Sequence, residues 1–138
     1  MTDLNKKNNF FKGRRIFFRT SEKKLNPGVE AENLAQKFLE KNNLQCIHKN
    51  YYTRLGEIDR IMLDDNLLIF VEVRLRSNRQ VSALESVDKF KQRKIIKAAQ
   101  YFLLENKQYQ NFPCRFDVIA LKQLSLDKII WVKDAFQI

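Results

Sequence analysis

Residues 56–74 read GEIDRIMLDDNLLIFVEVR, and this stretch decides the fold. A first strand over residues 56–63 and an apolar run over residues 67–73 flank the polar turn Asp64-Asp65-Asn66, which is the pattern of a β-hairpin. The second run is apolar on both faces, so we expect it to lie inside a sheet. Glu72 stands within that run, in a strand otherwise suited to burial.

The length of the hairpin turn decides which side chains meet. If Asp65-Asn66 is a two-residue loop, Asp64 faces Leu67, and Asp59 lies directly across from Glu72. Directly opposed Cβ atoms are about 4.5–5.5 Å apart. Two carboxylates at that range repel each other unless a cation or a proton lies between them. A three-residue loop would instead put the two acids on opposite faces.

Two interpretations of this acidic hairpin remain open. The first is a divalent-metal site, because a bound ion would explain an unpaired acid in a buried strand. The second is a salt-bridged polar strip, in which Arg74 neutralises Glu57 and reaches Asp59. The chain has no CxxC motif and only one histidine, His48. Carboxylates and waters are therefore the expected metal ligands, which favours Mg²⁺ or Mn²⁺ over zinc.

Helical and strand patterns surround the hairpin. The turn-forming residues Asn26-Pro27-Gly28 precede a helix that ends at Asn42-Asn43. The apolar stripe of this helix is Ala31, Leu34, Ala35, Phe38 and Leu39. We expect a second helix over residues 84–105 and further strands over residues 45–52, 114–121 and 129–132. The sequence therefore predicts a single α/β domain, residues 26–138, in the order αβββαββ.

The chain has 138 residues, of which 44% are hydrophobic, and a net charge of +10. Residues 1–25 hold eight Lys or Arg against two acids, and residues 6–19 interleave these cations with Phe10-Phe11 and Phe17-Phe18. We expect residues 1–25 to be flexible. Cations can follow phosphates and aromatic rings can stack on bases, so one interpretation of this segment is a nucleic-acid arm. A membrane-surface peptide and a tail of little function are the alternatives.

A second basic region follows the hairpin. Its members are Arg74, Arg76, Arg79, Lys89, Lys91, Arg93, Lys94 and Lys97. Cations at a helix N-terminus oppose the helix dipole, and phosphate binding would account for them; a solvated charged face is the alternative. Lys91 precedes Ile95 by four residues, so we expect it on the core side of its helix, turned toward the acidic hairpin.

Other features exclude some classes of protein. The sequence contains no run of 18 apolar residues, the length needed to span a membrane, and the basic N-terminus lacks the apolar region of a secretory signal. We therefore expect a cytoplasmic protein. Cys46 and Cys114 lie in apolar runs and are expected to be reduced thiols packed as small hydrophobes. Arg115 and Asp117 share a strand face and are expected to form a structural ion pair.

An ordered set of short motifs resembles the YraN-like family, small bacterial proteins assigned to the restriction-endonuclease-like PD-(D/E)XK superfamily. The resemblance covers nearly everything after residue 26. It rests on residues 28–35 (GVEAENLA), 50–51 (NY), 56–59 (GEID), 70–74 (FVEVR), 91–92 (KQ), 115–118 (RFDV) and 134–136 (DAF).

The resemblance implies a restriction-endonuclease-like fold, a mixed β-sheet flanked by helices. It also implies that Asp59 and Glu72 are metal ligands and that Glu32 is an accessory acid on the first helix. The superfamily pattern ends in Lys, whereas this chain has Arg74. Arginine stays protonated and cannot act as a base, although it can stabilise charge on a phosphate. Arg76 or Lys91 could take the place of the missing lysine.

Three functions are consistent with these features of the sequence. The first is a Mg²⁺- or Mn²⁺-dependent nuclease acting on DNA, in preference to RNA, with branched or single-stranded DNA as candidate substrates and Asp59, Glu72, Glu32 and Arg74 as catalytic residues. In it, Arg76, Arg79, Lys89, Lys91, Arg93 and Lys94 would bind the nucleic acid. The second is a nucleic-acid-binding module of the same fold whose cleavage chemistry has lapsed through Arg74. The third is a membrane-surface or protein-partner adaptor that uses residues 6–19.

Overall fold

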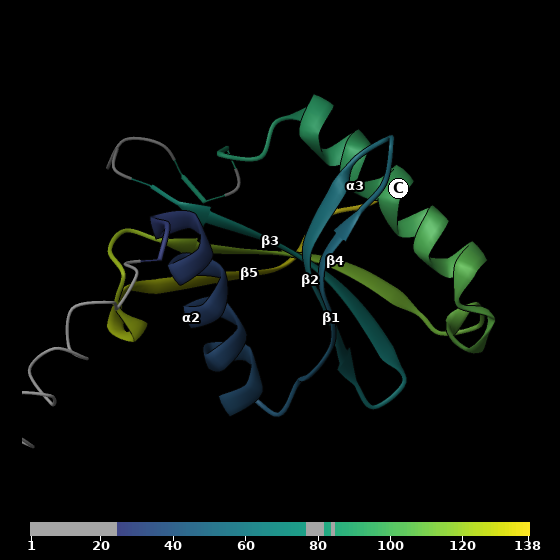
Figure 1. Ribbon diagram of the computed structural model, residues 1–138, viewed down its shortest axis with the longest axis horizontal. Helices are drawn as coiled ribbons and strands as arrows, with labels where there is room; N and C mark the ends of the chain where they lie inside the picture. Colours follow the sequence, from purple (N-terminus) through teal and green to yellow (C-terminus); the bar gives the residue numbers. More distant parts are fainter. Residues whose placement is uncertain (1–24, 77–81, 84) are drawn as a thin grey trace, which may run out of the picture.

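The computed structural model describes residues 25–76, 82–83 and 85–138. Its centre is one five-stranded sheet in the order β1-β2-β3-β4-β5, and α2 and α3 cover the two faces of the sheet (Figure 1). The elements in chain order are α2 (Pro27–Lys41), β1 (Gln45–Tyr52), β2 (Glu57–Asp64), β3 (Leu67–Leu75), α3 (Lys89–Glu105), β4 (Cys114–Leu121) and β5 (Ile129–Phe136). Two short 3₁₀ turns, η2 (Lys107–Tyr109) and η3 (Leu126–Lys128), precede β4 and β5. The predicted α/β class and the order αβββαββ are confirmed.

Local signals set both ends of α2. The Asn26 side chain accepts a hydrogen bond of 2.8 Å from the Gly28 amide, and Pro27 occupies the first helical position, where no amide is needed. At the other end Asn43 takes a left-handed backbone with φ of 68°, which a short polar side chain tolerates. The helix therefore ends where the sequence predicted.

The β2–β3 hairpin has the expected two-residue loop. Asp64 pairs with Leu67, and Asp65 has a φ of 50°, the left-handed conformation that such tight loops require. β3 then lies between β2 and β4, pairing antiparallel with the first and parallel with the second. The parallel pairing needs a crossover, which α3 provides. The expectation that residues 67–73 form an inner strand is confirmed.

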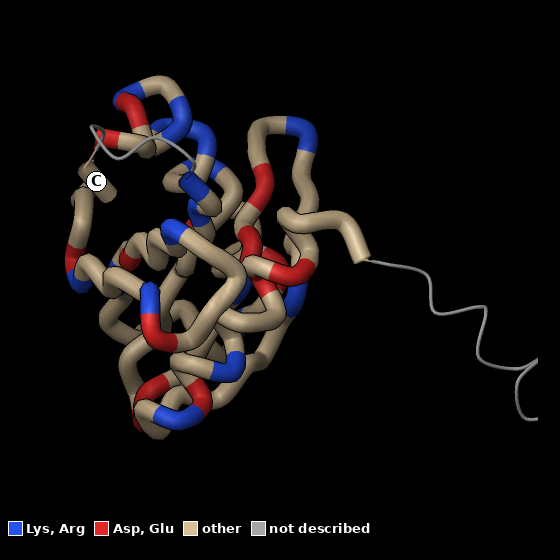
Figure 2. Tube along the Cα trace, turned by 90° about the vertical axis from the view of Figure 1, so that its left-hand side faces the viewer, with Lys and Arg blue, Asp and Glu red and all other residues tan. Residues whose placement is uncertain are grey.

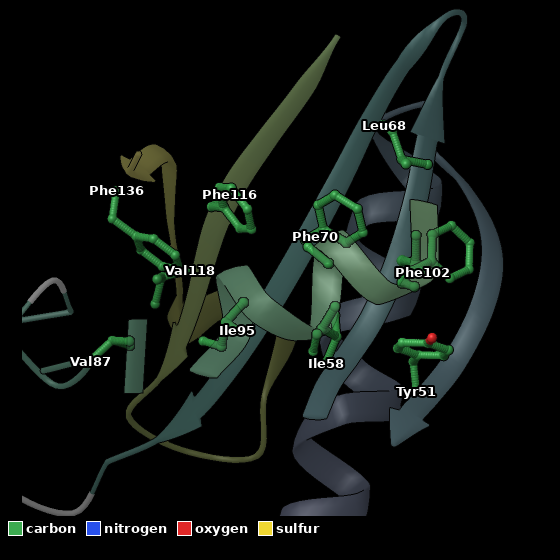
Figure 3. Packing of buried hydrophobic residues seen from close by; sticks show 13 residues of the cluster. Tyr51, Ile58, Leu68, Phe70, Val87, Ile95, Phe102, Phe116, Val118 and Phe136 are labelled. Carbon is green, nitrogen blue, oxygen red and sulfur yellow. The ribbon is translucent and has the colours of Figure 1, made fainter. Parts of the chain in front are cut away.

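Two hydrophobic cores lie on the two faces of the sheet. On the α3 face, Phe70 and Phe116 stack with ring centroids 5.4 Å apart, and Phe102 of α3 meets Phe70 edge-on (Figure 3). On the α2 face, Ala31, Ala35 and Leu39 pack on Met62, Ile69, Val71, Ile119 and Leu121. Burial on both faces explains why β3 carries almost no polar residue and why Glu72 stands out in it.

Two predicted boundaries are wrong. The second helix begins at Lys89, not at Leu84, which itself lies outside the described residues. Ser82 and Glu85 exchange hydrogen bonds of 3.1 and 3.2 Å in a preceding turn, and Asp88 then caps the helix by accepting from the Lys91 amide at 2.8 Å. The last strand extends to Phe136 rather than Val132, because it continues to pair with β4 up to the Phe116–Phe136 pair.

The cysteine prediction is also corrected. Cys114 is exposed at the first residue of β4, and Cys46 is only half-buried, so these free thiols are not both core residues. The Arg115–Asp117 ion pair is confirmed, with two contacts of 2.7 and 2.8 Å. Asp117 is fully buried and also accepts from the Trp131 indole at 2.9 Å. Among residues 25–76, 82–83 and 85–138, no helix has the length and apolar character needed to cross a membrane.

Gly56 lets the start of β2 approach α3 closely. A Cβ atom at Gly56 would lie 2.5 Å from the carbonyl oxygen of Lys94 and 2.8 Å from its carbonyl carbon. Real Cβ atoms do not approach backbone so closely, so any larger residue must push the strand and the helix apart. Gly56 is therefore required by packing against α3.

We predict that Gly56→Ala lowers the free energy of unfolding by about 1–3 kcal/mol, the usual cost of forcing an extra carbon into a packed contact. Urea unfolding measures the change. Gly28→Ala is the matched control, since its Cβ would meet only the Asn26 side chain, at 3.3 Å. Equal stability of Gly56→Ala and the wild type would contradict the close approach.

Candidate functional site

The acidic hairpin brings Asp59 and Glu72 together at the point where two strands separate. The β2–β3 pairing runs from Asp64–Leu67 to Arg60–Val71, and the same register continued by one residue sets Asp59 across from Glu72. There the Asp59 carboxylate accepts a hydrogen bond of 2.8 Å from the Val73 amide, in place of a backbone partner. The predicted register is confirmed.

Glu72 is a buried acid whose charge is only partly compensated. The residue is 3% exposed, and its Oε1 lies 3.7 Å from both Arg74 Nη1 and Lys91 Nζ. These distances are ion-pair distances, too long for hydrogen bonds. Its other oxygen, Oε2, is buried and receives no hydrogen bond from any donor of the described residues. An unpartnered carboxylate oxygen in an apolar strand is costly unless a proton or a cation satisfies it.

The two carboxyl groups alter each other's ionisation. Burial raises the pKa of Glu72 to about 8, and the negative charge of Asp59 adds to the rise. Burial also raises the pKa of Asp59, while the hydrogen bond from the Val73 amide works against that rise. The pair therefore titrates as a unit and keeps a proton near neutral pH when no cation lies between the two groups.

The cation that reaches across the site comes from α3. Lys91 Nζ lies 3.9 Å from Glu57 and 3.7 Å from Glu72, so this side chain turns toward the hairpin as the sequence predicted. The polar strip imagined from the sequence is wrong in its pairing. Arg74 is placed beside Glu72, on its own strand, and the described ion pairs of Glu57 include Lys91 but not Arg74.

Arg60 is the site residue that the sequence analysis missed. Its guanidinium is 2% exposed, and it donates hydrogen bonds to Asp59 O (2.7 Å), Gln36 Oε1 (2.8 Å), Asn33 Oδ1 (3.1 Å), Glu32 Oε2 (3.3 Å) and Asn50 Oδ1 (3.3 Å). The sequence contains a pattern that indicates this role for Arg60. Arg60 lies two residues before Met62 and therefore points to the same face of the strand, and the polar face of the first helix carries three acceptors at helical spacing.

Glu32 joins the site through Arg60. Its carboxylate lies 3.3 Å from the guanidinium. Burial raises the pKa of Glu32, and the nearby negative charge of Asp59 raises it further, while Arg60 acts in the opposite direction. Glu32 thus lies within electrostatic range of the acidic pair, on the α2 side, but its partner is a buried cation.

The remaining predicted residues are spread along the rim. Arg76 is half-buried at the end of β3, with Nε and Nη1 unpartnered among the described residues. Lys89, Arg93 and Lys94 are exposed on α3, and Arg79 lies outside the described residues, as do residues 6–19. Figure 2 shows acidic positions gathered on the side of the trace where α2 begins. Within the described part of the chain, no three His, Cys, Asp or Glu side chains form a cluster able to hold an ion.

A pocket of about 300 Å³ opens beside these residues, between the β1–β2 loop and the first half of α3. Its lining is formed by Tyr52, Thr53, Arg54, Leu55, Gly56, Glu57, Lys91 and Lys94. Glu57 and Lys91 belong both to this pocket and to the surroundings of Glu72. The pocket therefore adjoins the acidic pair through Lys91, while Asp59 and Glu72 themselves are not among its lining residues.

The raised pKa of Glu72 makes the stability of the protein depend on pH. The folded state holds a proton that the unfolded chain, with a glutamate pKa of 4.5, releases first. We therefore predict that stability falls between about pH 5 and about pH 8, by at most about 1.4 kcal/mol per pH unit from this group. Urea unfolding in a chelator measures the slope. Glu72→Gln should flatten it, the exposed Glu40→Gln should not, and an unchanged slope in Glu72→Gln would contradict the assignment.

The network around Arg60 predicts a second effect on stability. Arg60→Met should lower the free energy of unfolding by about 3–5 kcal/mol, because removing one partner leaves buried acceptors and the Glu32 charge uncompensated. Chemical denaturation tests this, with Arg93→Met on an exposed surface of α3 as the control. A loss of less than about 1 kcal/mol would show that the network contributes little.

Comparison with known proteins places the chain in a family. A model described as "Uncharacterised protein family UPF0102" matches residues 31–121, which include the acidic hairpin, Arg60 and Lys91. A UPF0102 protein of Alcanivorax borkumensis is 41% identical over 116 residues, which are 82% of this chain and 93% of the relative. A UPF0102 protein of Saccharophagus degradans is 44% identical over 110 residues, 79% and 91% of the two chains. In agreement with its resemblance to the YraN-like proteins, the chain belongs to the UPF0102 family.

Proposed function

We propose that this protein is a divalent-metal-dependent nuclease that acts on the phosphodiester backbone of DNA. The observation that carries the proposal is Glu72, an acid 3% exposed in an apolar strand, with Asp59 directly across the hairpin and one oxygen that has no partner in the described part of the chain. Placing two acids there destabilises the fold, as the raised pKa values of both groups indicate. Such perturbed, clustered groups are typical of functional sites.

The donor set fits one hard divalent ion. Asp59 and Glu72 would hold Mg²⁺ or Mn²⁺, which binds proteins through one or two carboxylates and completes its coordination with waters and substrate phosphate oxygens. The described residues contain no third carboxylate free to complete an all-protein cage, because Glu32 is engaged by Arg60. When bound, the ion supplies charge neutralisation of the phosphate and activation of water.

The protein's own side chains have separate roles in this proposal. Arg74, whose side chain is 40% exposed, binds and stabilises charge on the phosphate next to Glu72. Lys91, whose Nζ lies 3.7 Å from Glu72, would bind a substrate phosphate beside the acidic pair. Glu32 sustains the negative potential on the α2 side, and Arg60 fixes the backbone of Asp59 through its carbonyl oxygen.

Two further observations support a nucleic-acid substrate. The mixed sheet flanked by helices, with the acids on the hairpin of β2 and β3, is compatible with the restriction-endonuclease-like fold that the YraN-like resemblance implies. Exposed cations line the rim on α3, and the chain carries a net charge of +10, which favours polyanions. The superfamily resemblance favours DNA over RNA.

A binding module without cleavage is the second candidate. Arg74 stands where the superfamily pattern has lysine, and Lys91 and Arg74 already approach Glu72 to 3.7 Å. These two cations partly compensate the acid without a metal. In that case the basic rim would still bind nucleic acid.

The nuclease proposal predicts metal-dependent cleavage of a labelled DNA. Asp59→Asn and Glu72→Gln should each reduce Mn²⁺-dependent cleavage by more than about 100-fold, since direct ligands matter more than the surrounding residues whose loss costs 10- to 100-fold. Gel analysis of single-stranded, duplex and branched substrates measures it. Asp64→Asn, an exposed acid on the same strand, is the matched control and should cleave like the wild type.

Arg74 separates the two candidates. In the nuclease, Arg74→Ala slows cleavage; in the lapsed module the wild type binds DNA without cutting it under any divalent ion, and Arg74→Lys creates cleavage. Cleavage that survives both Asp59→Asn and Glu72→Gln would overturn the site assignment.

A further inference from the structure

The loop between β1 and β2 forms a preorganised wall of the pocket. Thr53 Oγ1 accepts hydrogen bonds from the amides of Leu55 and Gly56 at 3.1 and 3.0 Å and donates to the Gly56 carbonyl at 2.8 Å. The Thr53 amide adds a bond of 2.9 Å to the same carbonyl. Gly56 then rests against the backbone of Lys94. The loop is thus fixed internally and against α3, which favours a rigid binding wall.

The pocket is lined by exposed side chains of this loop and of Tyr52, the last residue of β1. Tyr52 is 69% exposed and Leu55 is 42% exposed, although both are apolar or aromatic. Arg54 on the loop and Lys94 across the pocket add two exposed cations. An aromatic ring beside cations is the combination that holds single-stranded nucleic acids, through base stacking and phosphate contacts.

Glu57 and Lys91 connect the pocket to the acidic pair. Tyr52 is the cross-strand partner of Glu57, and Glu57 shares Lys91 with Glu72. A polyanion entering the pocket meets one acid, Glu57, whose charge Lys91 offsets at 3.9 Å. A nucleic-acid strand that runs from the pocket to Glu72 therefore passes positively charged side chains.

We infer that this pocket binds one unpaired nucleotide of the substrate, with its base stacked on Tyr52 and its phosphate held by Arg54 and Lys94. The volume of about 300 Å³ suits one small ligand. In a duplex both faces of a base are occupied by its neighbours, so Tyr52 can stack only on a base that is free of them. The inference rests on the proposed function in one respect, that the adjoining phosphodiester lies at the acidic pair. The substrate class it names is single-stranded or branched DNA with an unpaired nucleotide at the cut.

The binding test uses the full chain without divalent ions, so that cleavage does not consume the probe. Fluorescence anisotropy compares a labelled single-stranded oligodeoxynucleotide with a blunt duplex of the same length. Tyr52→Ala should weaken single-strand binding about 5- to 150-fold, the range found for losing one stacked base, and change duplex binding little. Tyr52→Phe keeps the ring and should bind like the wild type, as should Tyr101→Ala, an exposed tyrosine of α3 outside the pocket.

A second measurement locates the base directly. A single strand carrying 5-iodouracil, irradiated with the protein, should cross-link to the peptide that contains Tyr52, and mass spectrometry identifies it. Single-strand binding unaffected by Tyr52→Ala, or weakened equally by Tyr101→Ala, overturns the pocket assignment. A cross-link found only outside residues 52–57 and 91–94 overturns it as well.

Failure of the proposed function gives a different result. Binding of single strands that depends on Tyr52, without cleavage under Mg²⁺ or Mn²⁺, keeps the pocket and contradicts the nuclease. Cleavage that needs Glu72 but is indifferent to Tyr52→Ala keeps the nuclease and overturns the pocket. A wild-type protein that binds no oligonucleotide overturns both.

Discussion

The buried guanidinium of Arg60 is the interaction on which the arrangement of this protein depends. A cation that is 2% exposed is tolerated only when its donors are satisfied, and here α2, β1 and the Asp59 carbonyl supply all five acceptors. These bonds form only when the helix lies on the sheet in one orientation. One of these bonds, 2.7 Å to the Asp59 carbonyl, ties the network to the residue that the β2–β3 register sets across from Glu72. Folding and the assembly of the acidic site are therefore coupled through one side chain.

Around Arg60, the acidic and basic side chains of the site nearly balance in charge, but within the described part of the chain the carboxylate oxygens of Glu72 are not fully hydrogen-bonded. Glu72 has two cations 3.7 Å from one oxygen, and among the described residues its other oxygen has no hydrogen-bond partner. A purely structural strip would be expected to form shorter bonds, such as the 2.7 Å contact between Arg115 and Asp117 on the neighbouring strand. The two acids differ in their hydrogen bonding: Asp117 fastens β4 to β5 through Trp131 and Asp134, whereas Glu72 has one oxygen with no partner among the described residues, as the proposed metal site requires. In the proposed function, the pocket on the α3 side would hold part of the polyanionic substrate.

Much of the fold follows from local patterns in the sequence. The strand over residues 45–52 and the strand over 114–121 have the predicted limits, and the hairpin register follows from a two-residue loop. The start of α3 was missed because residues 82–88 satisfy their polar groups in a turn, which apolar periodicity does not reveal. The pairing of Glu57 with Lys91 and the network of Arg60 were missed for another reason. Both join elements distant in the sequence. Spacing turned Lys91 toward the hairpin and put Arg60 and its helical acceptors on suitable faces, but it did not show which partners meet. The family resemblance had already indicated Glu32, Asp59 and Glu72.

The central claim, that Asp59 and Glu72 hold a divalent ion, is tested most directly by a crystal structure of the protein soaked in manganese. The anomalous signal of the ion identifies its position without reference to activity. The account predicts a manganese ion that is bound by one oxygen of Asp59 and by Glu72 Oε2, with Lys91 displaced from its position 3.7 Å from Glu72. An absence of anomalous signal between the two carboxylates at saturating manganese, with Lys91 still beside Glu72, would contradict it.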